Sequence, residues 1–125
     1  MHAEPAALFV YGTLQPDQAR WPLLAPFAAK AAHRPATVAG RLFDTGLGYP
    51  AAVFEGNSDA HVPGLIVELA DGMSERALHV LDKVEGTEFD LYARVLVTTT
   101  DGEAAWSYAW QGNCDELTPI ERWSP

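Results

Sequence analysis

One glutamate, Glu85 in the segment LDKVEG, stands where a predicted helix ends. A negative side chain at a helix C-terminus opposes the helix dipole, which costs about 0.3–1 kcal/mol and raises the pKa of the carboxyl slightly. Partial burial in a cleft would raise that pKa further, toward the value of about 6–7 that suits a general base near neutral pH. Glu85 is therefore a candidate general acid/base, and the alternative is a solvated glutamate at a helix end.

The second candidate is the turn in LFVYGTLQPDQ, residues 8–18, where an apolar strand runs into Gly12. Glycine permits a backbone conformation that turns the following amides outward, and such amides bind an anion or an oxyanion. Tyr11 supplies either a hydroxyl group or a packed ring. The alternative is a strand that ends at a glycine for structural reasons alone.

Other catalytic signatures are absent from the sequence. The four histidines are far apart, and none forms a metal-binding cluster with another histidine or with Cys114. There is no G-x-G-x-x-G or P-loop for a nucleotide, and no G-x-S-x-G for a nucleophilic serine. The sequence therefore predicts no metal and no cofactor.

The apolar pattern predicts six strands and one helix around these candidates. The strands are expected at residues 6–12, 36–46, 51–54, 61–70, 91–100 and 104–110. The helix is expected from about Glu75 to Glu85, with Ser74 as its N-cap and Gly86 as the residue that ends it. Asp101-Gly102 predicts a type I′ turn between the last two strands.

These elements predict an α+β domain spanning residues 1–125, with a sheet that curls into a small barrel. In the last strand Trp106, Tyr108 and Trp110 share one face, which is more typical of a packed core than of a pocket lining. The tail from Gly112 to Pro125 is polar and is expected to wrap around the surface.

The net charge and the apolar pattern of the chain argue against some classes of binding partner. The net charge of −9 and the pI near 4.6 argue against binding to nucleic-acid phosphates, which requires clustered basic residues. The longest apolar segment, WPLLAPFAAKAA, is interrupted by two prolines and a lysine and is too short to span a membrane. The N-terminus has no signal-peptide pattern, and a single cysteine suits a reducing compartment. We expect a cytoplasmic protein that binds neither nucleic acid nor membrane.

Five short motifs occur in an order and spacing typical of one family. They are VYGTL at 10–14, GRLFDTGLGYPAAV at 40–53, VPGLIVEL at 62–69, LDKVEG at 81–86 and LYARV at 91–95. Together they resemble the γ-glutamylcyclotransferase-like family. The resemblance implies a small mixed β-barrel flanked by helices, and an enzyme that needs no cofactor. The implied reaction cyclises a γ-glutamyl amine or peptide to 5-oxoproline and releases the amine.

The resemblance also implies roles for individual residues. Glu85 would be the general acid/base, and the substrate-binding turn would consist of Tyr11, Gly12, Thr13 and Leu14. The backbone amides of this turn would hold the substrate's carboxylate or the developing oxyanion.

Four further positions have less definite roles. Tyr49 is expected to shape the pocket wall, and Tyr92 matches the Y-x-R of the family. Arg94, the second residue of that motif, either receives a carboxylate or pairs with an acidic neighbour. Asp82 either raises the pKa of Glu85 by like-charge repulsion or is a carboxylate on the helix surface.

One departure from the family concerns the connection TEFDL, residues 87–91, which is unusually acidic. Glu88 and Asp90 either select a cationic leaving group or are merely solvated. Two alternatives to an enzyme remain: a non-catalytic small-molecule binding domain on the same scaffold, and an interaction module that uses an exposed Trp106/Tyr108/Trp110 face. The sequence leaves open the identity of the leaving amine and the oligomeric state.

Overall fold

The computed structural model of the chain describes residues 5–16, 18–86 and 91–123. Its strands are β1 (Ala7–Val10), β2 (Ala28–Asp44), β3 (Pro50–Phe54), β4 (His61–Leu69), β5 (Tyr92–Thr98), β6 (Ala104–Trp110) and β7 (Thr118–Ile120). Its helices are α1 (Trp21–Leu24), the short 3-10 helix η1 (Ala25–Phe27) and α2 (Ser74–Val84). No helix in these described ranges is long and apolar enough to cross a membrane.

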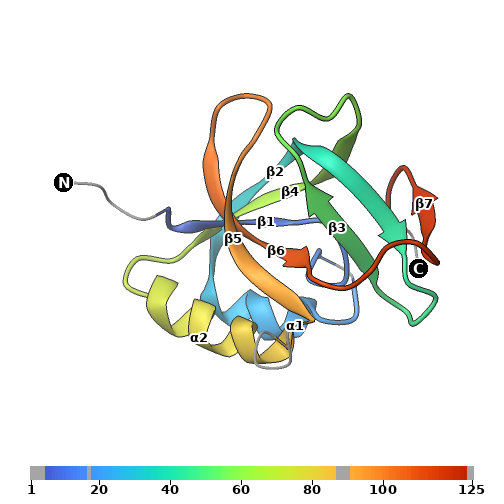
Figure 1. Cartoon of the computed structure of the whole chain (residues 1–125). Helices are drawn as coiled ribbons and strands as arrows, with labels where there is room; N and C mark the ends of the chain where they lie inside the picture. Colours follow the sequence, from blue (N-terminus) through green and yellow to red (C-terminus); the bar gives the residue numbers. More distant parts are fainter. Residues whose placement is uncertain (1–4, 17, 87–90, 124–125) are drawn as a thin grey trace.

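The strands form one seven-stranded mixed sheet in the order β3-β2-β4-β1-β6-β5, with β7 paired to β2. Strands β1 and β6 run parallel, and the other pairs are antiparallel. The sheet curls until β3 packs beside β6, which nearly closes a barrel, and α1 and α2 lie side by side at one end of it (Figure 1). The predicted α+β class and the small mixed barrel flanked by helices are confirmed.

Strand β1 is buried on both faces because it separates two cores. Phe9 and Tyr11 point into the core inside the barrel, while Leu8 and Val10 point into the core beneath α2. A strand in this position is apolar at every residue, which explains the uninterrupted run ALFV. The turn that follows β1 therefore continues directly from a fully buried strand.

The helix α2 agrees closely with its predicted bounds, with one correction. It begins at Ser74, so Met73 occupies the N-cap position, and no side chain caps the helix there. The predicted N-cap at Ser74 is wrong by one residue. At the other end Glu85 is the C-cap and Gly86 has a φ of 72°, a left-handed conformation that glycine adopts without strain.

The hairpin between β5 and β6 has a longer loop than predicted. The Thr99 amide donates to the Glu103 carbonyl, and the Gly102 amide donates to the Thr99 carbonyl. Three residues therefore lie in the loop, with Gly102 at a φ of 87°. This is the pattern of a turn followed by a glycine bulge and not a two-residue type I′ turn, so that prediction is wrong.

The aromatic face of β6 packs in the core beneath α2, as predicted. Tyr108 is 4% exposed, and Trp106 and Trp110 pack half-buried against the same cluster. An interaction module that requires this face to be exposed is therefore not supported. In the tail, β7 pairs with β2, and Ile120 packs against the core inside the barrel.

Candidate active site

A small cavity lies where β1 ends, between the C-terminus of α2 and the start of β3. Seven of the eight residues expected to form the site line it: Tyr11, Gly12, Thr13, Leu14, Tyr49, Glu85 and Tyr92. Its volume is about 30 Å³, room for about two water molecules or for one small polar group. The structure thus brings together residues that are up to 81 positions apart in the chain.

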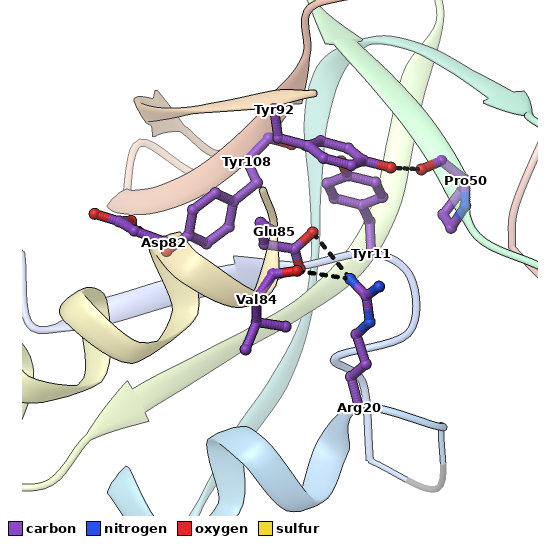
Figure 2. A network of polar contacts seen from close by, with 8 residues as sticks. All are labelled: Tyr11, Arg20, Pro50, Asp82, Val84, Glu85, Tyr92 and Tyr108. Atoms are coloured by element: carbon purple, nitrogen blue, oxygen red, sulfur yellow. Dashed lines mark hydrogen bonds and ion pairs between the residues drawn. The ribbon is translucent and has the colours of Figure 1, made fainter. Parts of the chain in front are cut away.

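Glu85 is the carboxylate of this cavity, and it is only 8% exposed. Its amide still donates to the Leu81 carbonyl, so the residue completes the last turn of α2 before Gly86 redirects the chain. Figure 2 shows its side chain among Tyr11, Tyr108 and Arg20.

Burial raises the pKa of Glu85 from its ordinary value of 4.5 to about 7, and the positive charge of Arg20 opposes this rise. A carboxyl with this pKa has both its protonated and its ionised form populated near neutral pH, as general acid/base catalysis requires. Asp82 is not among the causes of the shift. It accepts a hydrogen bond from the Tyr108 hydroxyl, so the hypothesis of like-charge repulsion is not supported.

Arg20 is a member of the site that the sequence analysis missed. Its Nη1 lies 3.5 Å from Oε2 of Glu85 and donates to the Val84 carbonyl at 3.4 Å. Its guanidinium carbon lies 5.9 Å from the ring centre of Tyr49, and its backbone amide donates to the Thr13 carbonyl at 2.8 Å. Arg20 belongs to none of the recognised motifs, so only its position in space reveals it.

The turn after β1 points its carbonyl groups back toward the protein. The Gly12 carbonyl accepts from the amide of Gln15 at 3.0 Å, and the Thr13 carbonyl accepts from Arg20. Within the described part of the chain, the amides of Thr13 and Leu14 donate to no acceptor. These amides are consequently available to an oxygen atom of a ligand.

Glycine is required at position 12 for a reason other than the one expected. Its φ is not in the left-handed region, so backbone freedom is not the cause. A Cβ atom there would lie 2.6 Å from Cγ of Pro50, far inside contact distance. Close packing of the turn against Pro50 therefore excludes any side chain.

We expect Gly12→Ala to destabilise the protein by about 1–3 kcal/mol, because the turn or Pro50 must move to relieve the overlap. The free energy of unfolding in urea measures the effect. Gly56→Ala is the matched control, since that glycine also lacks a left-handed φ and its Cβ would meet nothing within 4 Å. Equal stability changes in the two variants would contradict the packing explanation.

Three tyrosines enclose Glu85, and each hydroxyl has an acceptor in the protein. Tyr92 donates to the Pro50 carbonyl at 2.6 Å, and Tyr11 donates to the Tyr108 carbonyl at 2.5 Å. Tyr108 donates to Oδ1 of Asp82 at 2.8 Å. Burial raises the pKa of all three hydroxyls, so they stay neutral near pH 7. Their rings supply the apolar surroundings that raise the pKa of the carboxyl.

Tyr108 lines the cavity, although core packing was the favoured of its two expected roles. Its ring does both, because one face of β6 faces α2 where the helix ends at Glu85. The alternation of aromatic and small residues in β6 was the available signal, and it indicated burial without distinguishing a core from a cavity wall.

Arg94 does not line this cavity, so its expected role in receiving a carboxylate is corrected. Its Nε lies 3.3 Å from Oδ1 of Asp82, and its guanidinium lies 4.9 Å from the ring centre of Trp106. Arg94 lies two residues after Tyr92 on β5. Its side chain is directed to the surface of α2, about one helical turn before Glu85. Pairing with an acidic neighbour, the alternative, is what the structure shows.

The acidic connection with Glu88 and Asp90 lies outside the described residues. In the ranges 5–16, 18–86 and 91–123, no cluster of three or more histidine, cysteine, aspartate or glutamate side chains could hold a metal ion.

Comparison with solved structures shows the same fold in several proteins. YkqA from Bacillus subtilis is 27% identical with a TM-score of 0.69, and the match covers 94% of this chain but only 39% of the YkqA chain. An AIG2-like protein from Mus musculus is 18% identical with a TM-score of 0.65, and the match covers 98% of this chain and 90% of the mouse chain. A protein described as a gamma-glutamyl cyclotransferase is 16% identical with a TM-score of 0.51, covering 90% of this chain and 68% of the other.

A comparison with curated proteins found no match. The family profile described as gamma-glutamyl cyclotransferase, AIG2-like, matches residues 8–125, which include the cavity and every element around it. The chain belongs to the AIG2-like gamma-glutamyl cyclotransferase family.

Proposed function

We propose that the protein cyclises a γ-glutamyl amine or peptide to 5-oxoproline and releases the amine. One observation carries the proposal: the buried carboxyl of Glu85, with a pKa raised to about 7, faces a turn whose amides are available. Family membership points to the same reaction. This reaction joins two groups of one molecule, so the protein has to fold the substrate and manage its protons.

In this mechanism Glu85 accepts a proton from the substrate's α-ammonium group, and the freed amine attacks the γ-carbonyl carbon. The new C–N bond closes the five-membered ring, and the negative charge on the carbonyl oxygen is held by the amides of Thr13 and Leu14. When the original C–N bond breaks, Glu85 gives this proton to the departing amine and then accepts the second proton that the ring nitrogen must lose, which passes to the released amine or to solvent. The carboxylate is regenerated, and the reaction needs no covalent intermediate.

The small, partly open cavity suits the reacting atoms, while the leaving amine would extend toward solvent. The leaving amine would then be an amino acid, a peptide, a polyamine or a carrier-bound biosynthetic intermediate. We also place the reaction in the cytoplasm, because a chain with one cysteine, Cys114, suits a reducing compartment.

The alternative is a non-catalytic domain that binds a small molecule on the same scaffold. A binding domain has no need of a buried carboxyl such as that of Glu85, because burial of its charged form is unfavourable. Glu85 therefore favours the enzyme.

The proposal is tested by incubating the protein with a panel of γ-glutamyl amines and measuring 5-oxoproline and free amine. We expect equal amounts of the two products from at least one member of the panel. The matched control is the same substrate acetylated on its α-amine, which cannot attack and should yield neither product. Free glutamate in place of 5-oxoproline would indicate hydrolysis, and no product from any member would favour the binding domain.

A further inference from the structure

Arg20 lies beside the cavity, in contact with Glu85 and over the ring of Tyr49, and has no strong partner. What it binds is a question that rests on the proposed function and extends it. Its side chain is 33% exposed, whereas that of Glu85 is 9% exposed. Both of its side-chain hydrogen bonds come from Nη1 and measure 3.4 and 3.5 Å, the outer limit for such bonds. Within the described residues, Nε and Nη2 of this guanidinium have no acceptor.

The charges around the cavity match the two charges of a γ-glutamyl group. Among the described residues, the cavity lining contributes one ionisable carboxyl, Glu85, and no cation, and Arg20 is the cation in contact with that carboxyl. A γ-glutamyl group has an ammonium and a carboxylate on the same carbon atom. An anion and a cation side by side, as Glu85 and Arg20 are, complement this pair of charges.

We propose that Arg20 binds the α-carboxylate of the substrate while Glu85 receives the α-ammonium group. A guanidinium offers parallel N–H donors that fit both oxygens of a carboxylate, a stronger arrangement than its long contact with Glu85. Arg20 can turn toward this ligand while remaining in the site, because its backbone is tied to Thr13. Its guanidinium also lies over the ring of Tyr49.

The turn after β1 could bind the substrate's carboxylate or stabilise the oxyanion, and Arg20 takes over the first of these roles. With the carboxylate held by Arg20, the amides of Thr13 and Leu14 are free to stabilise the oxyanion. The positive charge of Arg20 lowers the pKa of Glu85 and so opposes the effect of burial. When the guanidinium moves from Glu85 toward the substrate, it lowers that pKa less. The ammonium group of the substrate then takes the place of the guanidinium beside the Glu85 carboxylate.

The test compares two substrates that differ only in the α-carboxylate. One is a γ-glutamyl amine, and the other is the 4-aminobutanoyl derivative of the same amine, which cyclises to 2-pyrrolidinone. We expect Arg20→Met to lower kcat/KM for the γ-glutamyl substrate by about 10- to 100-fold, the usual range for a lost hydrogen bond to a charged group. The same substitution should change kcat/KM for the 4-aminobutanoyl substrate little.

Arg20→Lys serves as a second variant, because it keeps the charge and removes the fork of donors. It should lose activity selectively toward the γ-glutamyl substrate, but by a smaller factor. Arg41→Met is the control for replacing an arginine, since that side chain is 62% exposed and pairs with Glu55 outside the cavity. It should leave the ratio of the two substrates unchanged.

Equal losses for both substrates in the Arg20 variants would overturn the proposal, because Arg20 would then act only through Glu85 or the turn. If the wild type cyclises neither substrate, the proposed reaction itself fails, and binding decides the role of Arg20. Calorimetry should then show that wild type binds 5-oxoproline more tightly than 2-pyrrolidinone and that Arg20→Met removes this preference. A preference that persists in Arg20→Met, or none in the wild type, would overturn the assignment.

Discussion

Replacing Glu85 with glutamine is expected to lower kcat for 5-oxoproline formation by about 10²- to 10⁴-fold, the usual contribution of a general acid/base. The amide has the volume of the carboxyl, so the cavity should keep its shape, but it cannot accept the proton of the α-ammonium group. Steady-state kinetics on the best substrate of the panel measure the effect. Circular dichroism and the unfolding transition of the variant verify that its fold is unchanged.

Glu75→Gln is the matched control, because Glu75 lies on the same helix, is exposed and is far from the cavity lining. It should retain the activity of the wild type. If Glu85→Gln and Glu75→Gln have equal activities, Glu85 is not the base and the mechanism proposed above is wrong. A large loss confined to the Glu85 variant would link the reaction to this cavity.

The elements predicted well from the sequence are those with strong local signals. The runs around β1 and β4 are rich in branched apolar residues, and Gly86 marks the end of α2. The first half of β2, AAKAAHRP, has no β-branched residue and owes its strand conformation to its pairing with β4. The helix α1 and strand β7 comprise four and three residues, which is too short for a periodic pattern to appear.

The same distinction applies to the site. Glu85 and the turn at Gly12 were noticed because each stands at the end of a predicted element, and the resemblance to the family then favoured a functional role for both. Arg20 was missed because its contact with Glu85 joins residues 65 positions apart and depends on a turn that no local pattern predicts. Arg94 shares a strand face with Tyr92, yet the spacing along β5 places it over α2 instead of the cavity.

The buried carboxyl of Glu85 is also expected to make folding stability depend on pH. Because its pKa is raised from 4.5 to about 7, the folded protein holds this proton more tightly than the unfolded chain does. Its contribution is therefore most favourable below about pH 4.5 and is lost as the pH rises to about 7. Each tenfold change in acidity is worth about 1.4 kcal/mol, so the loss amounts to about 3 kcal/mol.

Urea unfolding of wild type and Glu85→Gln at about pH 5 and about pH 8 isolates this effect, because the other acidic residues contribute equally to both proteins. Glutamine has no proton to lose, so the variant should gain about 2–3 kcal/mol relative to wild type between the two conditions. Parallel pH profiles would mean that Glu85 is already ionised at pH 5 in the folded state. The charge would then be solvated, and the carboxylate would be too weak a base for the proposed reaction. The burial that reduces stability is the same property that makes Glu85 a competent base, so the two measurements on this variant must agree.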